Sequence, residues 1–326
     1  MILPDTQALV GPGDGRFEGM TAWIADAARA GDVAFVTHVG DVVRDAGDAA
    51  QWARADAALA RLEGVVPYAG TLGNHDVTPL NRLDGDARAW RARFGPGSAA
   101  RGDGPPGASG LLATSPDGRA SVRWFAAGGR TLLHLSVPFE GGDARDDEGP
   151  LAWAERVLWH YAGVPTVITT HAYLWDGAVT ADDASGVAYL PPSERVGEVV
   201  DRDGDSPRVG VGGATLFRRL VAPFDAVFLV IGGHAHAAPV DVSGEAQRLV
   251  RNDAGLEVLE VLANFQARTG PDADAVRRVR VVPGGAGGTR DRVEVVTWRP
   301  QEDRAGEGPH ARFAWGLAWD LRFARP

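Results

Sequence analysis

Patterns typical of buried strands alternate with patterns typical of amphipathic helices in the first part of the chain. Residues 1–10 begin with an apolar run, and the stretches VAFVTHVGD (33–41) and VVPYAGTLGNHD (65–76) have the same strand character. Between them, residues 17–30 and 49–62 carry apolar side chains at helical spacing. This order of strand, helix, strand, helix, strand predicts parallel strands joined by right-handed crossovers.

The middle of the chain mixes loop-like and regular stretches. Residues 95–119 are rich in Gly, Pro, Ser and Ala, which predicts a long exposed excursion with little structure of its own. Strands are expected again at 120–137, a helix at 150–161, and a strand over PTVITTH (165–171). An acidic loop with Gly and Pro follows at about 176–212, and we expect the two irregular segments to shape any pocket.

The last part of the chain is predicted to be rich in strands. A helix at about 214–221 leads into DAVFLVIGGHAH (225–236), a buried strand that ends in two histidines. Beyond Leu256 the alternating stretches predict antiparallel strands, namely LEVLEVLANFQ, VRRVRVV, DRVEVVTW and FAWGLAWDLRF. We therefore expect one domain over residues 1–326, with a β-rich C-terminal extension from about residue 256.

Composition restricts the class of protein. Hydrophobic residues make up 44% of the chain and charged residues 23%, which is typical of a folded globular protein. The absence of cysteine excludes disulfides, thiolate metal sites and cysteine nucleophiles. A net charge of −10 disfavours general nucleic-acid binding. No apolar run approaches the roughly 20 residues that cross a bilayer, and Met1 directly precedes the first strand without a signal peptide. A cytoplasmic protein is the default expectation, and an exported protein whose signal has been removed is the alternative.

Side chains that bind metals follow the ends of five predicted strands. These are Asp5 and Gln7, Asp41, Asn74 and His75, His171, and His234 and His236. Because the carboxyl ends of parallel strands share one edge of a sheet, we expect these side chains to converge. Carboxylate, amide and imidazole groups suit divalent transition metals, and this set exceeds what one catalytic ion needs. It predicts two ions, with Asp41 placed to bridge them.

In chain order, these residues form a recognisable series of short blocks. The blocks are Asp5-Thr6-Gln7, Gly40-Asp41, Gly73-Asn74-His75-Asp76, His171 and Gly233-His234-Ala235-His236. The series resembles the calcineurin-like metallophosphoesterase superfamily, whose blocks read D-x-H, GD, GNH[DE], H and GHxH. Gln7 stands where the family has His, and with the late stretch ANFQ (263–266) it resembles a subgroup that carries D-T-Q. The resemblance implies an α/β fold, a four-layer α/β/β/α sandwich of two mixed sheets.

The resemblance also implies a role for each residue. Two divalent ions would be bound, each of them Mn, Fe or Zn. One would be bound by Asp5, Gln7, Asp41 and His236, and the other by Asp41, Asn74, His171 and His234. His75 would be a catalytic histidine that assists the leaving oxygen, with Asp76 or Asp45 orienting its imidazole. The implied activity is hydrolysis of a phosphomonoester or phosphodiester by metal-activated hydroxide.

Several alternatives differ in what the site would do. A metal- or ligand-binding protein with little turnover is one, and Gln7, either a ligand or a partner of a ligand, is the feature that admits it. A dinuclear-metal hydrolase of a non-phosphate ester or amide is another. The stretch GPGDGRFEG (11–19) has Arg16 where a dinucleotide loop needs its third Gly, and the chain contains neither G-x-S-x-G nor H-E-x-x-H. Nucleotide cofactor, serine hydrolase and zincin chemistries therefore lack their residues.

Overall fold

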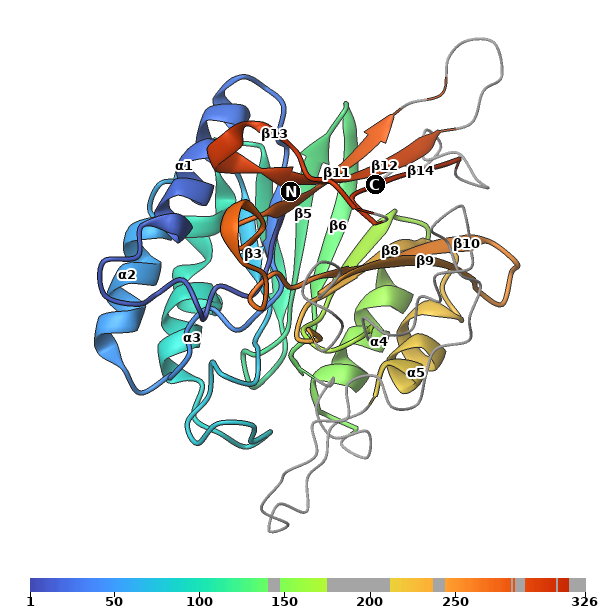
Figure 1. Ribbon diagram of the computed structural model, residues 1–326. Helices are drawn as coiled ribbons and strands as arrows, with labels where there is room; N and C mark the ends of the chain where they lie inside the picture. Colours follow the sequence, from blue (N-terminus) through green and yellow to red (C-terminus); the bar gives the residue numbers. More distant parts are fainter. Residues whose placement is uncertain are drawn as a thin grey trace.

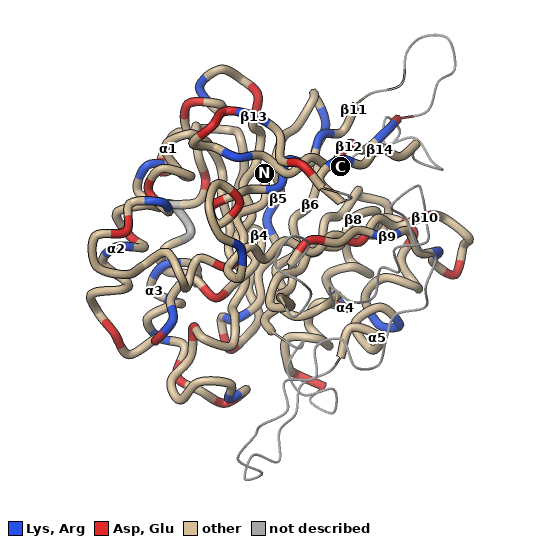
Figure 2. Tube along the Cα trace, in the orientation of Figure 1, with Lys and Arg blue, Asp and Glu red and all other residues tan. Residues whose placement is uncertain are grey.

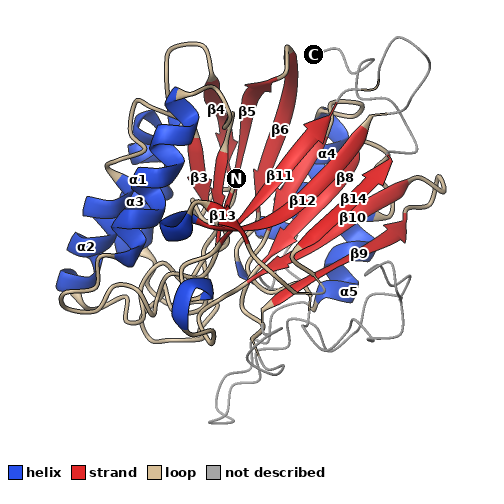
Figure 3. Cartoon of the chain, turned by 45° about the horizontal axis from the view of Figure 1, so that its top comes forward, coloured by secondary structure: helices blue, strands red, loops and turns tan. Residues whose placement is uncertain are grey.

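The chain folds into two β-sheets that face each other, with helices on both outer sides (Figure 1). The computed structural model describes residues 1–139, 147–174, 212–236, 244–282, 284, 291–308 and 310–316. Figure 3 shows α1, α2 and α3 beside one sheet, and α4 and α5 beside the other. The expected α/β/β/α sandwich of two mixed sheets is confirmed.

The first sheet combines the N-terminal parallel strands with the last strands of the chain. Its order is β13-β12-β11-β1-β2-β3, and β14 also pairs with β12. The N-terminal strands pair in parallel, with Ile2 opposite Thr37 and Val36 opposite Tyr68, whereas the C-terminal strands pair antiparallel. The strands are β1 (Ile2–Leu3), β2 (Val36–His38), β3 (Tyr68–Gly70), β11 (Val276–Val282), β12 (Arg292–Arg299), β13 (Arg304–Ala305) and β14 (Arg312–Gly316).

The second sheet has the order β4-β5-β6-β7-β8-β10-β9. Its strands are β4 (Ser109–Thr114), β5 (Ser121–Ala127), β6 (Arg130–Ser136), β7 (Thr166–Thr169), β8 (Val227–Gly232), β9 (Glu245–Arg251) and β10 (Glu257–Ala263). The expectation of only antiparallel strands beyond Leu256 is wrong for β10, which pairs in parallel with β8 and antiparallel with β9. All seven residues of β10 are buried, because it lies inside the sheet rather than at its edge.

In the described part of the chain, five helices cover the outer faces of the sheets. Three lie against the first sheet, namely α1 (Arg16–Arg29), α2 (Ala49–Leu59) and α3 (Arg88–Phe94). Two lie against the second sheet, namely α4 (Pro150–His160) and α5 (Gly213–Leu216), and a π-helical segment, Phe217–Val221, continues α5. At the start of α2 the carboxylate of Asp48 accepts hydrogen bonds from the backbone N–H groups of Ala50 and Gln51, which fixes where the helix begins.

Three hydrophobic cores hold the four layers together. One, with Phe17, Met20 and Trp52, lies between the N-terminal helices and the first sheet. A second packs α4 and α5 on the second sheet, and the third fills the space between the sheets with side chains such as Phe228 and Leu259. Burying one such side chain contributes about 1.5–3 kcal/mol, so the apolar alternation that predicts the elements also holds the layers together.

The segment 95–119 differs from its sequence-based expectation. Pro96–Asp103 form a 3-10 helix and β4 (Ser109–Thr114) is an edge strand of the second sheet. Two glycines permit close contact here instead of flexibility, since a Cβ at Gly102 would lie 2.3 Å from the Tyr68 carbonyl and one at Gly104 2.5 Å from the Pro67 nitrogen. The other predicted pocket loop, about 176–212, lies almost wholly outside the described residues.

Charged side chains are distributed over the whole described trace. Figure 2 shows acidic and basic residues interspersed, and many of them pair, as Arg93 does with Asp56 at 2.7 Å and Arg299 with Asp272 at 2.6 Å. Among the described helices, none has both the length and the apolar character needed to cross a membrane.

Candidate metal centre

Loops from both sheets meet where the parallel strands end. A Cβ at Gly40 would lie 2.8 Å from His171 Nδ1, and one at Gly73 would lie 2.1 Å from the Asp41 backbone nitrogen. Only glycine allows these loops to approach so closely. Asp41 and His234 both have positive φ angles, of 53° and 67°, which non-glycine residues adopt at a cost in energy and mainly at functional sites. The backbone is thus shaped to bring particular side chains together.

Four side chains direct polar atoms at one another in the interior. Asn74 Oδ1 lies 2.9 Å from His171 Nε2 and 3.0 Å from His234 Nδ1. His171 Nε2 also lies 3.2 Å from Asp41 Oδ2 and 3.2 Å from His234 Nδ1. The donor atoms of Asp41, His171 and His234 all lie within 4.8 Å of one another. Such spacing is what a single bound cation requires.

Hydrogen bonds on the outer side of this cluster determine which atoms face inward. His171 Nδ1 donates to the Val39 carbonyl at 2.8 Å, so a neutral His171 presents the lone pair of Nε2 to the cluster. Asn74 Nδ2 donates to Asn81 Oδ1 at 2.6 Å, which turns the Asn74 oxygen inward. Electron pairs therefore face each other in the interior, and a cation fits between them.

The charges in the cluster also favour a cation. Burial lowers the pKa of His171, but the charge and hydrogen bond of Asp41, the charge of Asp5 and the hydrogen bond to the Val39 carbonyl together outweigh burial and raise that pKa to about 10. Burial and the neighbouring charge of His171 lower the pKa of His234 to about 4. A buried carboxylate needs a positive partner, and here either a proton on His171 or a metal ion supplies it.

A second group of ligands lies beside the first, around Asp5 and Gln7. The Asp5 carboxylate accepts hydrogen bonds from the His234 backbone N–H at 3.1 Å and from Asn264 Nδ2 at 2.9 Å. Gln7 Nε2 donates to Asp41 Oδ2 at 3.2 Å and to Gln266 Oε1 at 2.8 Å. These bonds leave Gln7 Oε1 buried, and it has no hydrogen-bond partner among the described residues. An unpartnered buried oxygen fits a cation as its partner.

A cleft of about 150 Å³ opens over both groups. Its lining consists of Gln7, Asp41, His75, His234, Ala235, His236 and Gln266. His75 is partly exposed and His236 is exposed, so both are accessible to a ligand in the cleft. The structure thus brings all the residues expected to bind metal or act on substrate to one place, apart from the carboxylates of Asp76 and Asp45.

Asp76 and Asp45 do not orient His75 in the way the sequence suggested. His75 Nδ1 donates to the Arg44 carbonyl at 2.8 Å. The Asp76 carboxylate instead accepts hydrogen bonds from the backbone N–H groups of Val42 at 2.9 Å and Gly73 at 3.0 Å. Asp45 Oδ1 accepts from the Gly47 N–H at 2.8 Å. A backbone carbonyl therefore holds the imidazole, and Asp76 ties together the loops that follow β2 and β3.

Two residues of the centre were indicated only by the stretch ANFQ. Asn264 and Gln266 follow β10 and contact Asp5 and Gln7, each across 259 positions of sequence. Asn264 Nδ2 also donates to the His234 carbonyl at 2.9 Å. A Cβ at Gly244 would lie 1.4 Å from the Asn264 carbonyl oxygen, so this turn needs glycine. The sequence signal was the pair of amide residues at a strand end, without any indication of which residues they contact.

The sequence is similar to a described protein family and to a protein of Bacillus subtilis. Residues 1–238 match the family described as calcineurin-like phosphoesterase. The uncharacterized protein YvnB of Bacillus subtilis (strain 168) is 25% identical over 264 residues, which cover 78% of this chain and 16% of that protein. This chain therefore spans about a sixth of the length of that relative.

Solved structures with similar folds include phosphatases. A dimetal phosphatase from Danio rerio has a TM-score of 0.50 at 13% identity, covering 91% of this chain and 89% of that chain. Purple acid phosphatase PPD1 from yellow lupin (Lupinus luteus) has a TM-score of 0.48 at 13% identity, covering 97% of this chain and 53% of that chain. At such identity the first of these supports the fold. The match of the family model to most of the sequence shows that the chain belongs to the calcineurin-like phosphoesterase family.

Proposed function

We propose that the chain hydrolyses phosphomonoesters or phosphodiesters with two divalent ions held in the cleft. The observation that carries this proposal is that electron pairs of four side chains face one another. The donor atoms of Asp41, His171 and His234 lie within 4.8 Å of one another. Asn74 Oδ1 lies 2.9 Å from His171 Nε2 and 3.0 Å from His234 Nδ1. The chain belongs to a family of phosphoesterases, and this membership supports the use of these four side chains in hydrolysis at phosphorus. Specific substrate contacts then decide which ester is hydrolysed.

Two overlapping sets of ligands are available for the ions. Asp41, Asn74, His171 and His234 would hold one, and Asp5, Gln7, Asp41 and His236 would hold the other. The unpartnered Oε1 of Gln7 makes that residue a ligand in this proposal. Divalent Mn, Fe or Zn ions held by these residues would supply positive charge for the phosphate and would lower the pKa of bound water.

His75 is placed to act on the leaving group. Its Nδ1 is held by the Arg44 carbonyl at 2.8 Å, which directs the other ring nitrogen away from that loop. The ring lines the cleft together with Asp41 and His234. A protonated Nε2 can donate to the oxygen that leaves phosphorus, and positioned acid catalysis of this kind contributes about 10²–10⁴-fold.

Asp76 and the two late amide residues support the ligands without taking part in chemistry. Asp76 is fully buried and fixes the loops that carry Asp41 and Asn74 through its bonds to backbone N–H groups. Asn264 holds Asp5, and Gln266 fixes the direction of the Gln7 amide. Gln266 also lines the cleft, where its side chain can meet a phosphate oxygen.

The proposal is tested with purified protein stripped of metal by a chelator and then reloaded with Mn, Fe or Zn. Hydrolysis of p-nitrophenyl phosphate and bis-p-nitrophenyl phosphate should return only with metal, and Asn74→Ala should abolish it. His160→Ala is the matched control, because this histidine is exposed at the end of α4. Bound metal without turnover on either ester would instead indicate a binding protein or a hydrolase of another bond.

A further inference from the structure

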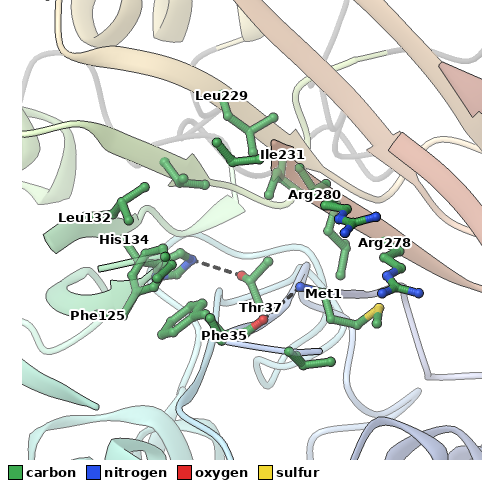
Figure 4. Close-up of a pocket in the computed structure, with 18 of the residues that line it drawn as sticks. Met1, Phe35, Thr37, Phe125, Leu132, His134, Leu229, Ile231, Arg278 and Arg280 are labelled. Carbon is green, nitrogen blue, oxygen red and sulfur yellow. Dashed lines mark hydrogen bonds between the residues drawn. The ribbon is translucent and has the colours of Figure 1, made fainter. Parts of the chain in front are cut away.

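We infer a second binding site, for an amphiphilic carboxylate such as a medium-chain fatty acid, in a cavity between the two sheets. The cavity measures about 320 Å³ and is shown in Figure 4. Its lining is drawn from β1, β2 and β11 of the first sheet and from β5, β6, β7 and β8 of the second. Nothing in the phosphoesterase chemistry uses it.

The cavity lies at the end of the sandwich opposite the metal centre. Ile2 and Phe35, which line it, stand at the amino ends of β1 and β2. Asp5 and Asp41 follow the carboxyl ends of the same two strands. No described residue lines both this cavity and the metal cleft, so the two sites are separate in the part of the chain that the structure describes.

Apolar and aromatic side chains form most of the wall. Phe35 and Phe125 stack with ring centroids 4.5 Å apart, and the His134 ring lies 4.9 Å from that of Phe35. Leu229 and Ile231 close the opposite side in Figure 4. His134 contributes no charge, because burial lowers its pKa to about 3, and its Nε2 contacts the Thr37 hydroxyl at 2.9 Å.

The size of the cavity suits more than a solvent molecule. An apolar cavity of about 150 Å³ stays dry and holds one benzene molecule. The present cavity, at about 320 Å³, offers roughly twice that space. It lies within the usual range for sites that bind small molecules, which are mostly apolar with a few charged groups. A flexible chain of about ten carbons is a ligand of this class.

Arginines at one side of the cavity favour an anionic head group. Arg278 and Arg280, on β11, lie together across from Phe125 and His134 in Figure 4. Within the described residues, neither guanidinium forms a hydrogen bond or an ion pair. Arg130, by contrast, is bonded to Asp291 at 3.1 Å. Asp32 is the acidic side chain of the lining, and it is exposed, so positive charge predominates there.

Charge and shape together select the occupant. An apolar tail fits between the phenyl rings, and a carboxylate can accept two parallel hydrogen bonds from a guanidinium. A neutral lipid would leave the two arginines without an anionic partner. A nucleic acid needs several basic side chains in contact with its phosphates, and this mostly apolar cavity does not offer them. The cavity therefore suits an amphiphilic carboxylate with a single apolar chain.

The test is calorimetric titration of the full chain with decanoate, with decanol and hexanoate as comparison ligands. Decanoate should saturate one site, and each methylene removed should weaken binding about fourfold. Arg278→Ala and Arg280→Ala should each weaken decanoate binding about two- to fivefold and leave decanol unaffected. Arg304→Ala, an exposed arginine on β13, is the control that should change nothing.

Variants that fill the cavity complete the test. Leu132→Trp and Ile231→Phe should each abolish decanoate binding. Thermal unfolding shows whether each variant is folded, and two variants are used so that the test remains valid if one of them does not fold. Titration without saturation, decanol binding as tight as decanoate, or unchanged affinity in a folded cavity-filling variant would each overturn the assignment.

Discussion

The two halves of the candidate metal centre are built in different ways. Asn74, His171 and His234 converge directly, at 2.9–3.2 Å, and hydrogen bonds to Asn81 and the Val39 carbonyl hold two of them from behind. Asp5 and Gln7 are instead held by the side-chain amides of Asn264 and Gln266. The first half lies wholly within residues 1–238 that match the family, whereas the second needs residues beyond them.

This difference has a consequence for the metals. In the proposed ligand sets each half has one amide oxygen, from Asn74 or from Gln7. Two buried or partly buried imidazoles would make the half around His171 the softer, whereas a single exposed imidazole, His236, would make the half around Gln7 the harder and weaker. We therefore expect the site around His171 to bind the tighter ion. The site around Gln7 should accept manganese or magnesium and should be partly empty in purified protein.

The largest effect is expected from removing a ligand of the tighter site. His171→Ala should reduce metal affinity there by more than about 100-fold, which exceeds the usual effect of changes behind a ligand, and should abolish turnover. Metal analysis and ester hydrolysis measure both, with His160→Ala as the control. If the His171→Ala variant kept its full metal content, His171 would not be a metal ligand.

A smaller effect is expected where the side chain acts on substrate instead of metal. His75→Ala should keep both ions and slow hydrolysis by about 10²–10⁴-fold, most strongly for esters with a poor leaving group. Comparing p-nitrophenyl phosphate with phenyl phosphate gives the readout. Equal slowing for both esters would assign His75 to binding and not to the leaving oxygen.

Asp76 allows a test of the loops that carry Asp41 and Asn74. Asp76→Ala leaves the buried N–H groups of Val42 and Gly73 without their partner, which should cost about 1–3 kcal/mol of unfolding free energy. Urea unfolding of the metal-free protein measures this loss. A wild-type midpoint together with lost turnover would instead restore a direct catalytic role to Asp76.

Removing the support of Asp5 should affect one half more than the other. Asn264→Ala should weaken the site around Gln7 by about 10–100-fold, the usual range for a group that holds a ligand. The tighter site should change less, because Asn264 contacts only the backbone carbonyl of His234 there. Manganese titration distinguishes the two sites. Equal weakening of both would show that Asn264 supports the whole centre.

The smallest expected change is at the residue that departs from the family pattern. Gln7→His should tighten the weaker site and shift its preference from manganese toward zinc or iron, since imidazole nitrogen is the softer donor. Competition between manganese and zinc provides the measurement. If the preference between manganese and zinc did not change, Gln7 would not be a metal ligand, and its amide would instead contact Asp41 or the substrate.

The sequence predicted the parts of this molecule that depend on local patterns. Apolar periodicity gave the strands and helices, and polar residues at strand ends gave Asp5, Asp41, Asn74 and His171, because parallel strands end on the same edge. Local patterns could not predict contacts between segments that are far apart in the sequence. Asn264 and Gln266 lie 259 residues from their partners, and β10 pairs in parallel only because of where the chain returns to the sheet.

Glycine was the least informative residue type in the sequence. In 95–119, composition predicted a loop, whereas Gly102 and Gly104 serve close backbone contacts with the segment that carries β3. The orientation of His75 was also unpredictable, since its partner is a carbonyl, which every residue possesses. Side-chain identity therefore predicted which residues converge at the strand ends, but it did not predict the groups that hold them in place.

The most direct test of this account is the stoichiometry of manganese binding to metal-free protein, followed by calorimetry. The account predicts two ions per chain with unequal affinities, and loss of the tighter one alone in Asn74→Ala. Both ions bound with equal affinity, or no binding at all, would contradict it.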